Sequence, residues 1–485
     1  MAKLILPLFG GGAAVWTSCL LFFQTFLLLG YLYAHALTKL RTMRAQVMVH
    51  GTLLIGSLLV LPVGMSGLDG QISSSSPLAD IIILLAATVG LPYFLLSSTG
   101  PLVQRWLTYA EQGTLPYRLY SLSNIGSLLA LTTYPFLIEP SFAMDSQTLT
   151  WSIGYTLFVG VFGVLGVMML RLPQDVVAKS KADDDTSIAG YKVDSLLWIL
   201  LSAVGVILLV STTNAMTQNI PPMPFLWILP LCIYLLSFII AFNGSRWYVR
   251  WYWLVLFTIS SFAAVLMFFI GSQFDILSMI GMYSLILLSA CMICHGELAR
   301  IKPPAQKLTL FYLYISLGGA LGSLFVSFIA TELFVQFLEF PIAIFAVFVL
   351  FMVCLKRYPA KSETRPIAAL FGLTQQAVLK GASLVSLLLV FLMFYTLHGL
   401  YDQYNVDSSR NFYGILAVKD VEVNGKRQRR LIDGTTSHGT QSLESNEAMI
   451  PLSYYRANTG GALVLQNFAP GKPIDVGFIG LGAGA

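Results

Sequence analysis

The chain has 485 residues, of which 56% are hydrophobic and 11% are charged, and its mean hydropathy is +0.76. A soluble globular chain carries about 25% charged residues, so this composition excludes that class and indicates a multi-pass membrane protein in a lipid bilayer. The net charge of +5 comes from the connections between the apolar runs of the chain. We expect no nucleic-acid partner.

Long uncharged runs recur along the chain, and most approach the roughly 20 residues that cross a bilayer as a helix. They predict a helical polytopic protein of about twelve spans, the shortest of them near Phe340. The runs are Ala13–Thr38, Gln46–Val63, Ile81–Thr99, Tyr120–Ile138, Leu149–Leu170, Ser195–Ser211, Pro224–Phe242, Trp251–Gly271, Ile276–Cys294, Leu308–Ala330, Phe340–Leu355 and Ala382–Leu400.

Lys and Arg are confined to alternate connections between the runs. One set of connections holds nineteen of them, whereas the other set holds acidic residues such as Asp275, Glu332 and Glu339 and no Lys or Arg. The basic set is cytoplasmic under the positive-inside rule. The residues from Tyr401 onward are then extracytoplasmic, unless the run Ala382–Leu400 does not cross.

A charged segment divides the apolar part into two bundles. Residues 1–171 are predicted to form a first bundle, 172–194 a cytoplasmic linker and 195–400 a second bundle, with about five and seven spans. One further helix ahead of Met1 would give six spans, a linker and six spans, followed by an extra span. Apart from that extra span, this is how major-facilitator transporters are built, which is an analogy at the level of fold only.

The composition changes from Tyr401, where we expect a small folded domain over residues 401–485. Asn424-Gly425 lies between two strand-like segments and predicts a hairpin, because both residues tolerate positive φ. We expect a polar loop over Gly434–Gln441. At the end of the sequence, a buried strand runs into Gly480-x-Gly482-x-Gly484, a loop typical of nucleotide-cofactor sites. The acidic residue that grips the ribose in such sites lies about 20 residues further on, so we interpret the chain as a fragment.

Several segments together resemble one family of bacterial membrane proteins, in which a transporter-like part is fused to a spermidine-synthase-like domain. A further apolar helix usually precedes Leu6–Gly12 in that family, so we expect truncation at the front as well. The segments that carry the resemblance are Leu6–Gly12, Ala14–Trp16, Gly90–Phe94, Ser123–Ser127, Pro230–Ser237, Cys294–Ala299, Ser316–Gly322, Arg410–Gly414, Leu431–Gly439, Tyr454-Tyr455 and the terminal glycine loop.

The resemblance implies a bacterial inner-membrane protein with the N-terminal part of an α/β aminopropyltransferase-like domain. The cofactor that the resemblance implies is decarboxylated S-adenosylmethionine or S-adenosylmethionine, which Gly480, Gly482 and Gly484 would approach, and the implied substrate is a small amine or polyamine. The candidate substrate-binding residues are Asp433, His438, Gln441, Tyr454 and Tyr455. True synthases carry a glutamine and a Tyr-His-Glu where this chain has Ser437-His438 and Tyr454-Tyr455-Arg456. The catalytic aspartate lies past Ala485, so no catalytic residue is assigned and we expect this fragment to be inactive.

Three alternatives stay open. His438 and Gln441, with Asp433 nearby, either form a polar pocket floor or satisfy backbone groups. Cys291-x-x-Cys294-His295 matches a haem-attachment pattern, but a histidine at a cytoplasmic helix end is the favoured interpretation. The whole chain is either an enzyme-bearing protein or a transporter-like or scaffold protein with a non-catalytic appended domain.

Ionisable groups are nearly absent from the spans, which disfavours proton coupling. The polar candidates there are Gln24, Asn124, Asn214 and Gln218.

Overall fold

The structure is a computed structural model. It describes residues 2–40, 42–64, 76–110, 115–171, 192–219, 224–304, 307–359, 374–434, 436–453 and 456–468, together with single positions between 471 and 477. Within these ranges, twelve helices are long and apolar enough to cross a membrane. The prediction of about twelve spans is therefore confirmed. The expected strand and glycine loop that end the sequence lie outside the described residues.

Five of the spans precede the charged segment. A short helix α1 (Ala2–Phe9) is followed by Gly10, whose φ of +76° separates it from α2. The spans are α2 (Ala13–Thr38); α3 (Met43–Ser57) continued by η1 (Leu58–Val60); α4 (Pro77–Leu85), η2 (Ala86–Gly90) and α5 (Leu91–Ala110) as one rod; α6 (Leu115–Thr133) with η3 (Tyr134–Ile138) and α7 (Glu139–Ser141); and α8 (Met144–Leu170).

Seven spans follow the charged segment. The run near Phe340 forms a complete span, α16, and the last run forms α18. The seven are α10 (Lys192–Asn219); α11 (Pro224–Asn243); α12 (Arg250–Ile270); α13 (Ile276–Arg300); α14 (Leu308–Leu324) with η9 (Phe325–Ile329) and α15 (Ala330–Leu333); α16 (Glu339–Arg357); and α18 (Gln375–Asp402). Helix α10 extends past the predicted end at Ser211, because Thr212, Thr213 and Asn214 are buried in the bundle.

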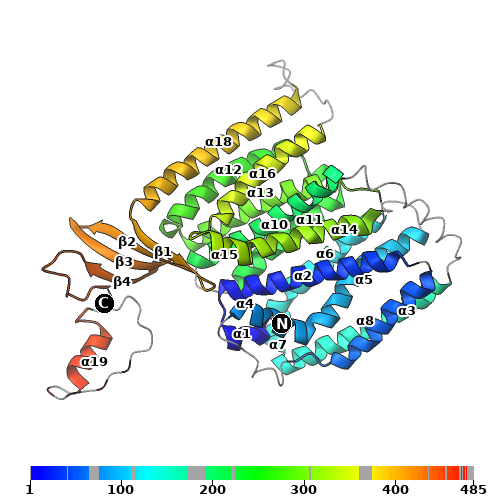
Figure 1. The fold of residues 1–485 in the computed structure, drawn as a ribbon, viewed down its shortest axis with the longest axis horizontal. Helices are drawn as coiled ribbons and strands as arrows, with labels where there is room; N and C mark the ends of the chain where they lie inside the picture. The colour runs from blue at the N-terminus through cyan, green and yellow to red at the C-terminus, as the bar shows by residue number, and fades with distance from the viewer. Residues whose placement is uncertain are drawn as a thin grey trace.

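The spans lie side by side in one bundle (Figure 1). Helix α10 is at its centre and packs most extensively on α14. Glycine makes this close approach possible, because a Cβ added at Gly318 would lie 2.3 Å from the Ile199 carbonyl oxygen and one at Gly322 would lie 2.6 Å from that of Ala203. The first five spans meet the last seven mainly where α2 contacts α14 and where α6 contacts α11.

A four-stranded antiparallel sheet follows α18, with strand order β1-β2-β3-β4. The strands are β1 (Asn405–Arg410), β2 (Ile415–Val423), β3 (Lys426–Asp433) and β4 (Thr436–Ser442), and a helix, α19 (Gly460–Phe468), comes later. Asn424 and Gly425, with φ of 53° and 75°, form the two-residue turn between β2 and β3. The predicted hairpin is confirmed.

The expectation of a polar loop over Gly434–Gln441 is wrong. Gly434, with φ of 56°, makes a tight turn that pairs Asp433 with Thr436, and the chain continues as β4. This polar segment can form a strand because β3 lies beside it and provides the backbone hydrogen-bonding partners along its length. The polar residues of this segment predict exposure to solvent, but its backbone conformation depends on pairing with the neighbouring strand β3.

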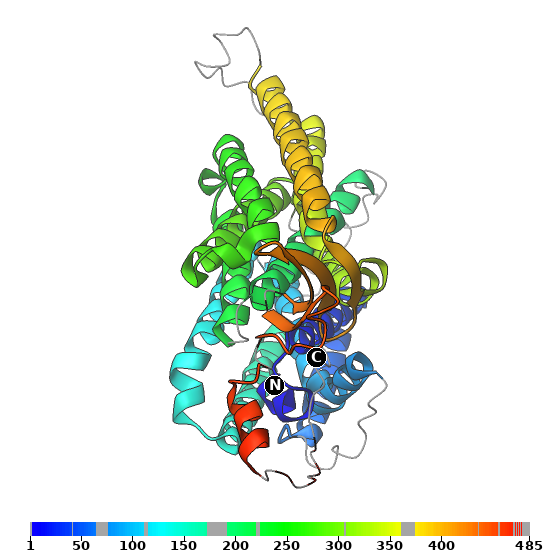
Figure 2. The ribbon, with the colours of Figure 1, turned by 90° about the vertical axis from the view of Figure 1, so that its left-hand side faces the viewer.

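The sheet lies at the end of the bundle where α2 begins and α18 ends (Figures 1 and 2). Glu332 and Glu339 are at this end, and the Arg410 side chain of β1 contacts the loop between α15 and α16. The described basic residues of the other connections, such as Arg171, Arg246 and Arg300, lie at the opposite end. The structure thus separates an acidic end, which carries the sheet, from a basic end.

Candidate functional site

A cavity of about 800 Å³ lies between the acidic end of the bundle and the sheet. Small-molecule sites have volumes of roughly 300–1,000 Å³, so this cavity is large enough to hold a small organic solute. Its wall is formed by the sheet and by both helix sets, which are the five spans before the charged segment and the seven spans after it. The lining comprises Gly12–Ala14, Thr17 and Ser18 of α2 and its start; Ser76–Leu78 at α4; Asn214 and Thr217 of α10; Val326–Phe328, Thr331 and Glu332; Phe334, Val335 and Phe337; Arg410–Ile415; and Asp433 and Thr436.

Thr17 and Asn214 join the two helix sets at the cavity wall. The Thr17 hydroxyl can donate to the Asn214 side-chain carbonyl, 3.2 Å away, or to the backbone carbonyl of Ala13, 3.0 Å away. Asn214 was one of the polar residues that the sequence singled out. A hydroxyl and a carboxamide at this position offer a solute both donor and acceptor groups, and they connect α2 with α10 at the same point.

The π-helical turn η9, which packs against both α2 and α10, forms another part of the wall. π-helical turns inside α-helices occur frequently at functional sites, and three residues of this one, Val326, Ser327 and Phe328, line the cavity. The Ser327 hydroxyl is buried and has no hydrogen-bond partner among the described residues. The residue therefore lines the cavity while its hydroxyl oxygen is shielded from it.

The turn between β1 and β2 closes the cavity from the side of the sheet. Asn411 fixes this turn, because its side-chain carbonyl accepts hydrogen bonds from the backbone amides of Tyr413 (2.9 Å) and Gly414 (3.3 Å). Asp433, on the neighbouring strand β3, also lines the cavity, as does Glu332 of α15. Neither carboxylate forms an ion pair with another described residue, so both can attract a cation.

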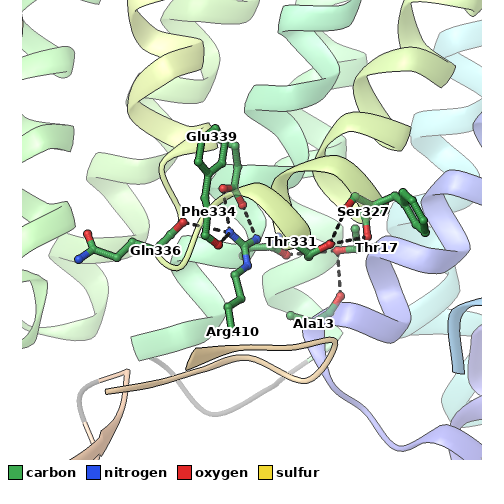
Figure 3. Close-up of polar contacts among 10 residues, drawn as sticks. Ala13, Thr17, Ser327, Thr331, Phe334, Gln336, Glu339 and Arg410 are labelled. Atoms are coloured by element: carbon green, nitrogen blue, oxygen red, sulfur yellow. Dashed lines mark hydrogen bonds and ion pairs between the residues drawn. The ribbon is translucent and has the colours of Figure 1, made fainter. Parts of the chain in front are cut away.

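Arg410, which also lines the cavity, is held by the bundle (Figure 3). Its guanidinium donates to both carboxylate oxygens of Glu339, at 2.8 and 3.1 Å, and to the Gln336 carbonyl at 3.0 Å. The two charged side chains are 3% and 0% exposed. A bidentate, desolvated pair of this kind is stronger and more specific than an exposed one, and it fixes β1 against the start of α16.

Of the predicted substrate-binding residues that the structure describes, Asp433 and Gln441 lie apart from each other. Asp433 lines the cavity, whereas Gln441 is near the other end of the β3–β4 pairing, where its amide donates to the Ala448 carbonyl at 3.4 Å. His438 is the extra residue of a β-bulge, since Ile432 pairs with Ser437 and Leu431 with Gly439. Asp433 and Gln441 thus form no common floor. Tyr454, Tyr455, Gly480, Gly482 and Gly484 lie outside the described residues.

Other polar residues of the spans have structural surroundings. Asn124 donates to the Tyr120 carbonyl of its own helix, the Gln24 carbonyl oxygen lies against Gly319, and the Gln218 side chain lies outside the described set. His295 is fully buried, with its Nδ1 2.8 Å from the Ser237 hydroxyl. Cys291 and Cys294 are buried and form no disulfide, and His295 lies near the C-terminal end of α13, at the helix end where the favoured interpretation places it. No group of three metal-ligating side chains occurs in the described part of the chain.

Sequence reasoning missed the Arg410–Glu339 pair. Each residue was noted, Arg410 in a segment that carries the resemblance and Glu339 in an acidic connection. They are 71 positions apart, and their pairing depends on how the sheet sits on the bundle. No periodicity or short motif connects them.

Comparisons with known proteins do not identify a family for this chain. No protein-family model matches the chain, and no curated protein matches it. Nine chains of solved structures match. One of them is the E. coli fucose:proton symporter FucP, which is 11% identical in sequence, with a TM-score of 0.40, over 74% of this chain and 94% of the symporter chain.

Proposed function

We propose that this chain is a transporter-like membrane protein that binds a small solute in the cavity where its two helix sets meet the sheet. The observation that carries the proposal is the cavity itself, because α2 of the first set, α10 and η9 of the second set, and the sheet all contribute to its wall. Transporters bind their substrates where two repeats or bundles meet and alternate access around that site. A major-facilitator-like arrangement of the two sets belongs to the same proposal.

The lining favours a small amine or polyamine as the solute. Asp433 and Glu332 provide carboxylates, and Thr17 and Asn214 provide a hydroxyl and a carboxamide. Ammonium groups carry several N–H donors and a positive charge, so they suit this combination of acceptors. Arg410 does not oppose such a cation, because its charge is already paired with Glu339.

Uptake into reconstituted vesicles tests the proposal. Labelled putrescine and spermidine should accumulate in vesicles that contain the protein, and Asp433→Asn should reduce the initial rate several-fold, because one carboxylate of the cavity is lost. The matched control is Asp420→Asn, which removes a carboxylate from the same sheet but away from the cavity. Absence of flux with every amine and amino acid tested would count against transport, and equal effects of the two substitutions would count against an amine in this cavity.

The orientation that we propose is a bacterial inner-membrane protein with the sheet outside the cytoplasm. It is supported by the positive-inside rule and by the position of the sheet at the acidic end of the bundle. A membrane-impermeant maleimide should label Asn446→Cys, on an exposed turn after β4, and not Arg246→Cys in intact spheroplasts. The reverse labelling pattern would refute this orientation.

A spermidine-synthase-like activity is the second candidate. Its support is the resemblance of Leu431–Gly434 to the segment that lines the synthase active site, together with the location of Asp433 at the cavity. The described residues include no complete cofactor site, and the glycine loop that the resemblance assigns to the cofactor lies outside them, so the activity is proposed for the protein as a whole. Calorimetric titration of that protein with S-adenosylmethionine and its decarboxylated form tests it, and no heat of binding with either would rule it out.

A further inference from the structure

The surroundings of Arg410 have the composition of a site for an organic cation. Glu339, which is fully buried, offers a carboxylate, and the loop after α15 turns the carbonyl oxygens of Phe334 and Gln336 toward the same guanidinium, at 3.5 and 3.0 Å. The ring of Phe337 lies beneath it, with the guanidinium carbon 4.4 Å from the ring centroid. Carboxylate, carbonyl and aromatic face are the groups that recognise guanidinium and ammonium ions.

All of these groups belong to the bundle, whereas their occupant belongs to the sheet. Phe334, Gln336, Phe337 and Glu339 lie between residues 334 and 339, in the loop before α16 and its first turn, and Arg410 is the last residue of β1. The acceptors therefore form a site that exists apart from the sheet. An unpaired carboxylate in such a buried position would be costly, so the site demands a cation.

We propose that Glu339, the carbonyls of Phe334 and Gln336 and the ring of Phe337 form a recognition site for the guanidinium or primary ammonium group of a small cation, which Arg410 occupies in this structure. The site adjoins the cavity, because Arg410, Phe334 and Phe337 also line it. A cation that enters the cavity competes with Arg410, and its binding releases β1 from the start of α16. The sheet is thus an intramolecular competitor that keeps this site closed.

The test uses methylguanidinium and methylammonium chlorides at concentrations that do not denature the protein. Removal of the occupant by Arg410→Ala should increase the affinity for methylguanidinium at least tenfold over that of the unmodified protein, as measured by calorimetry on the purified, detergent-solubilised protein. Adding Glu339→Gln to Arg410→Ala should abolish the gain. Comparison of the two salts decides between a guanidinium and an ammonium as the preferred group.

The matched control is Arg429→Ala. Arg429 also forms a bidentate pair with a carboxylate, at 2.8 and 2.9 Å from Asp420, but both side chains are exposed and lie on the sheet alone. It should not change the affinity for either salt. Equal affinities of Arg410→Ala and the unmodified protein would overturn the proposal, and so would an Arg410→Ala gain that persists with Glu339→Gln.

A second variant keeps the proposal testable if Arg410→Ala does not fold. Arg410→Lys retains the charge but makes fewer hydrogen bonds, so methylguanidinium should displace it and increase the rate of tryptic cleavage in the sheet at least threefold. An unchanged cleavage rate would refute the competition. The inference does not rest on transport, because binding and cleavage are measured without flux; loss of flux alone would challenge only the proposed function.

Discussion

Single glycines decide how closely α10 and α14 pack. A Cβ at Gly318 would lie 2.3 Å from the carbonyl oxygen of Ile199, which is backbone and cannot move aside. We therefore expect Gly318→Ala to destabilise the protein by about 1–3 kcal/mol, the usual effect of overpacking. The measurement is the thermal midpoint in detergent. Gly281→Ala in α13 is the control, since nothing lies within 4 Å of its added Cβ; equal losses in the two variants would contradict the packing argument.

A buried ion pair joins three helices at the basic end. The Arg250 guanidinium donates to Glu297 at 2.6 and 2.7 Å, and it also donates to the Tyr358 carbonyl just after α16. The Tyr248 hydroxyl donates to the same carboxylate at 2.8 Å, and burial and the Glu297 charge raise the pKa of Tyr248 well above its usual range. Tyr248 thus stays a neutral donor at physiological pH.

Breaking this pair on one side should be costly. Glu297→Gln leaves the Arg250 charge buried and uncompensated, for which we expect a loss of roughly 3–5 kcal/mol, measured as a lower thermal midpoint. Asp420→Asn, which breaks the exposed pair with Arg429, should produce no measurable shift because exposed pairs contribute little. Similar shifts in both variants would show that the burial of the pair does not matter.

At the scale of elements, the spans and the central hairpin were predictable because their signals are local. The length of an apolar run identifies a span, and the two residues Asn424-Gly425 identify the turn of the hairpin. Strand β4 was not predictable in this way, because its polar sequence becomes a strand only against the edge of β3. The bulge at His438 likewise depends on the β3–β4 register, which no single segment encodes.

The cavity shows the same division between local and non-local information. Asn214 and Asp433 were identified from the sequence, one as a polar residue in a span and the other through a resemblance. Ser327 and the Arg410–Glu339 pair were not, since a π-helical turn and a contact between distant segments are properties of the assembled bundle. Sequence reasoning therefore found residues of the cavity but not the cavity.

The hairpin turn should be intolerant of side chains that disfavour positive φ. Gly425 has φ of +75°, so Gly425→Val should strain the turn and loosen the pairing of β2 with β3. We expect faster tryptic cleavage at Arg427, Arg429 and Arg430 with the thermal midpoint of the bundle unchanged. Gly461→Val in α19, where a side chain meets nothing and φ is negative, is the control and should leave cleavage in the sheet unchanged.

At the scale of the whole molecule, the proposed transport requires the two helix sets to move relative to each other. Thr17 and Asn214 lie on opposite sets and are in contact. In Thr17→Cys/Asn214→Cys, a disulfide or a short thiol cross-linker should abolish amine uptake, and reduction should restore it. Each single cysteine variant under the same oxidation is the control. Full uptake by the cross-linked protein would show that no separation of α2 from α10 is needed.

The short connection between α18 and β1 affects how strongly Arg410 competes for the site around Glu339. Only Gln403 and Tyr404 separate Asp402, the last residue of the helix, from Asn405, the first of the strand. A short tether of this kind presents a group to its binding site at an effective concentration in the millimolar range. A free cation must therefore reach a comparable local concentration or bind with more contacts than one guanidinium makes. Longer polycations meet the second condition, so we expect the proposed competition to favour solutes with more than one positive group.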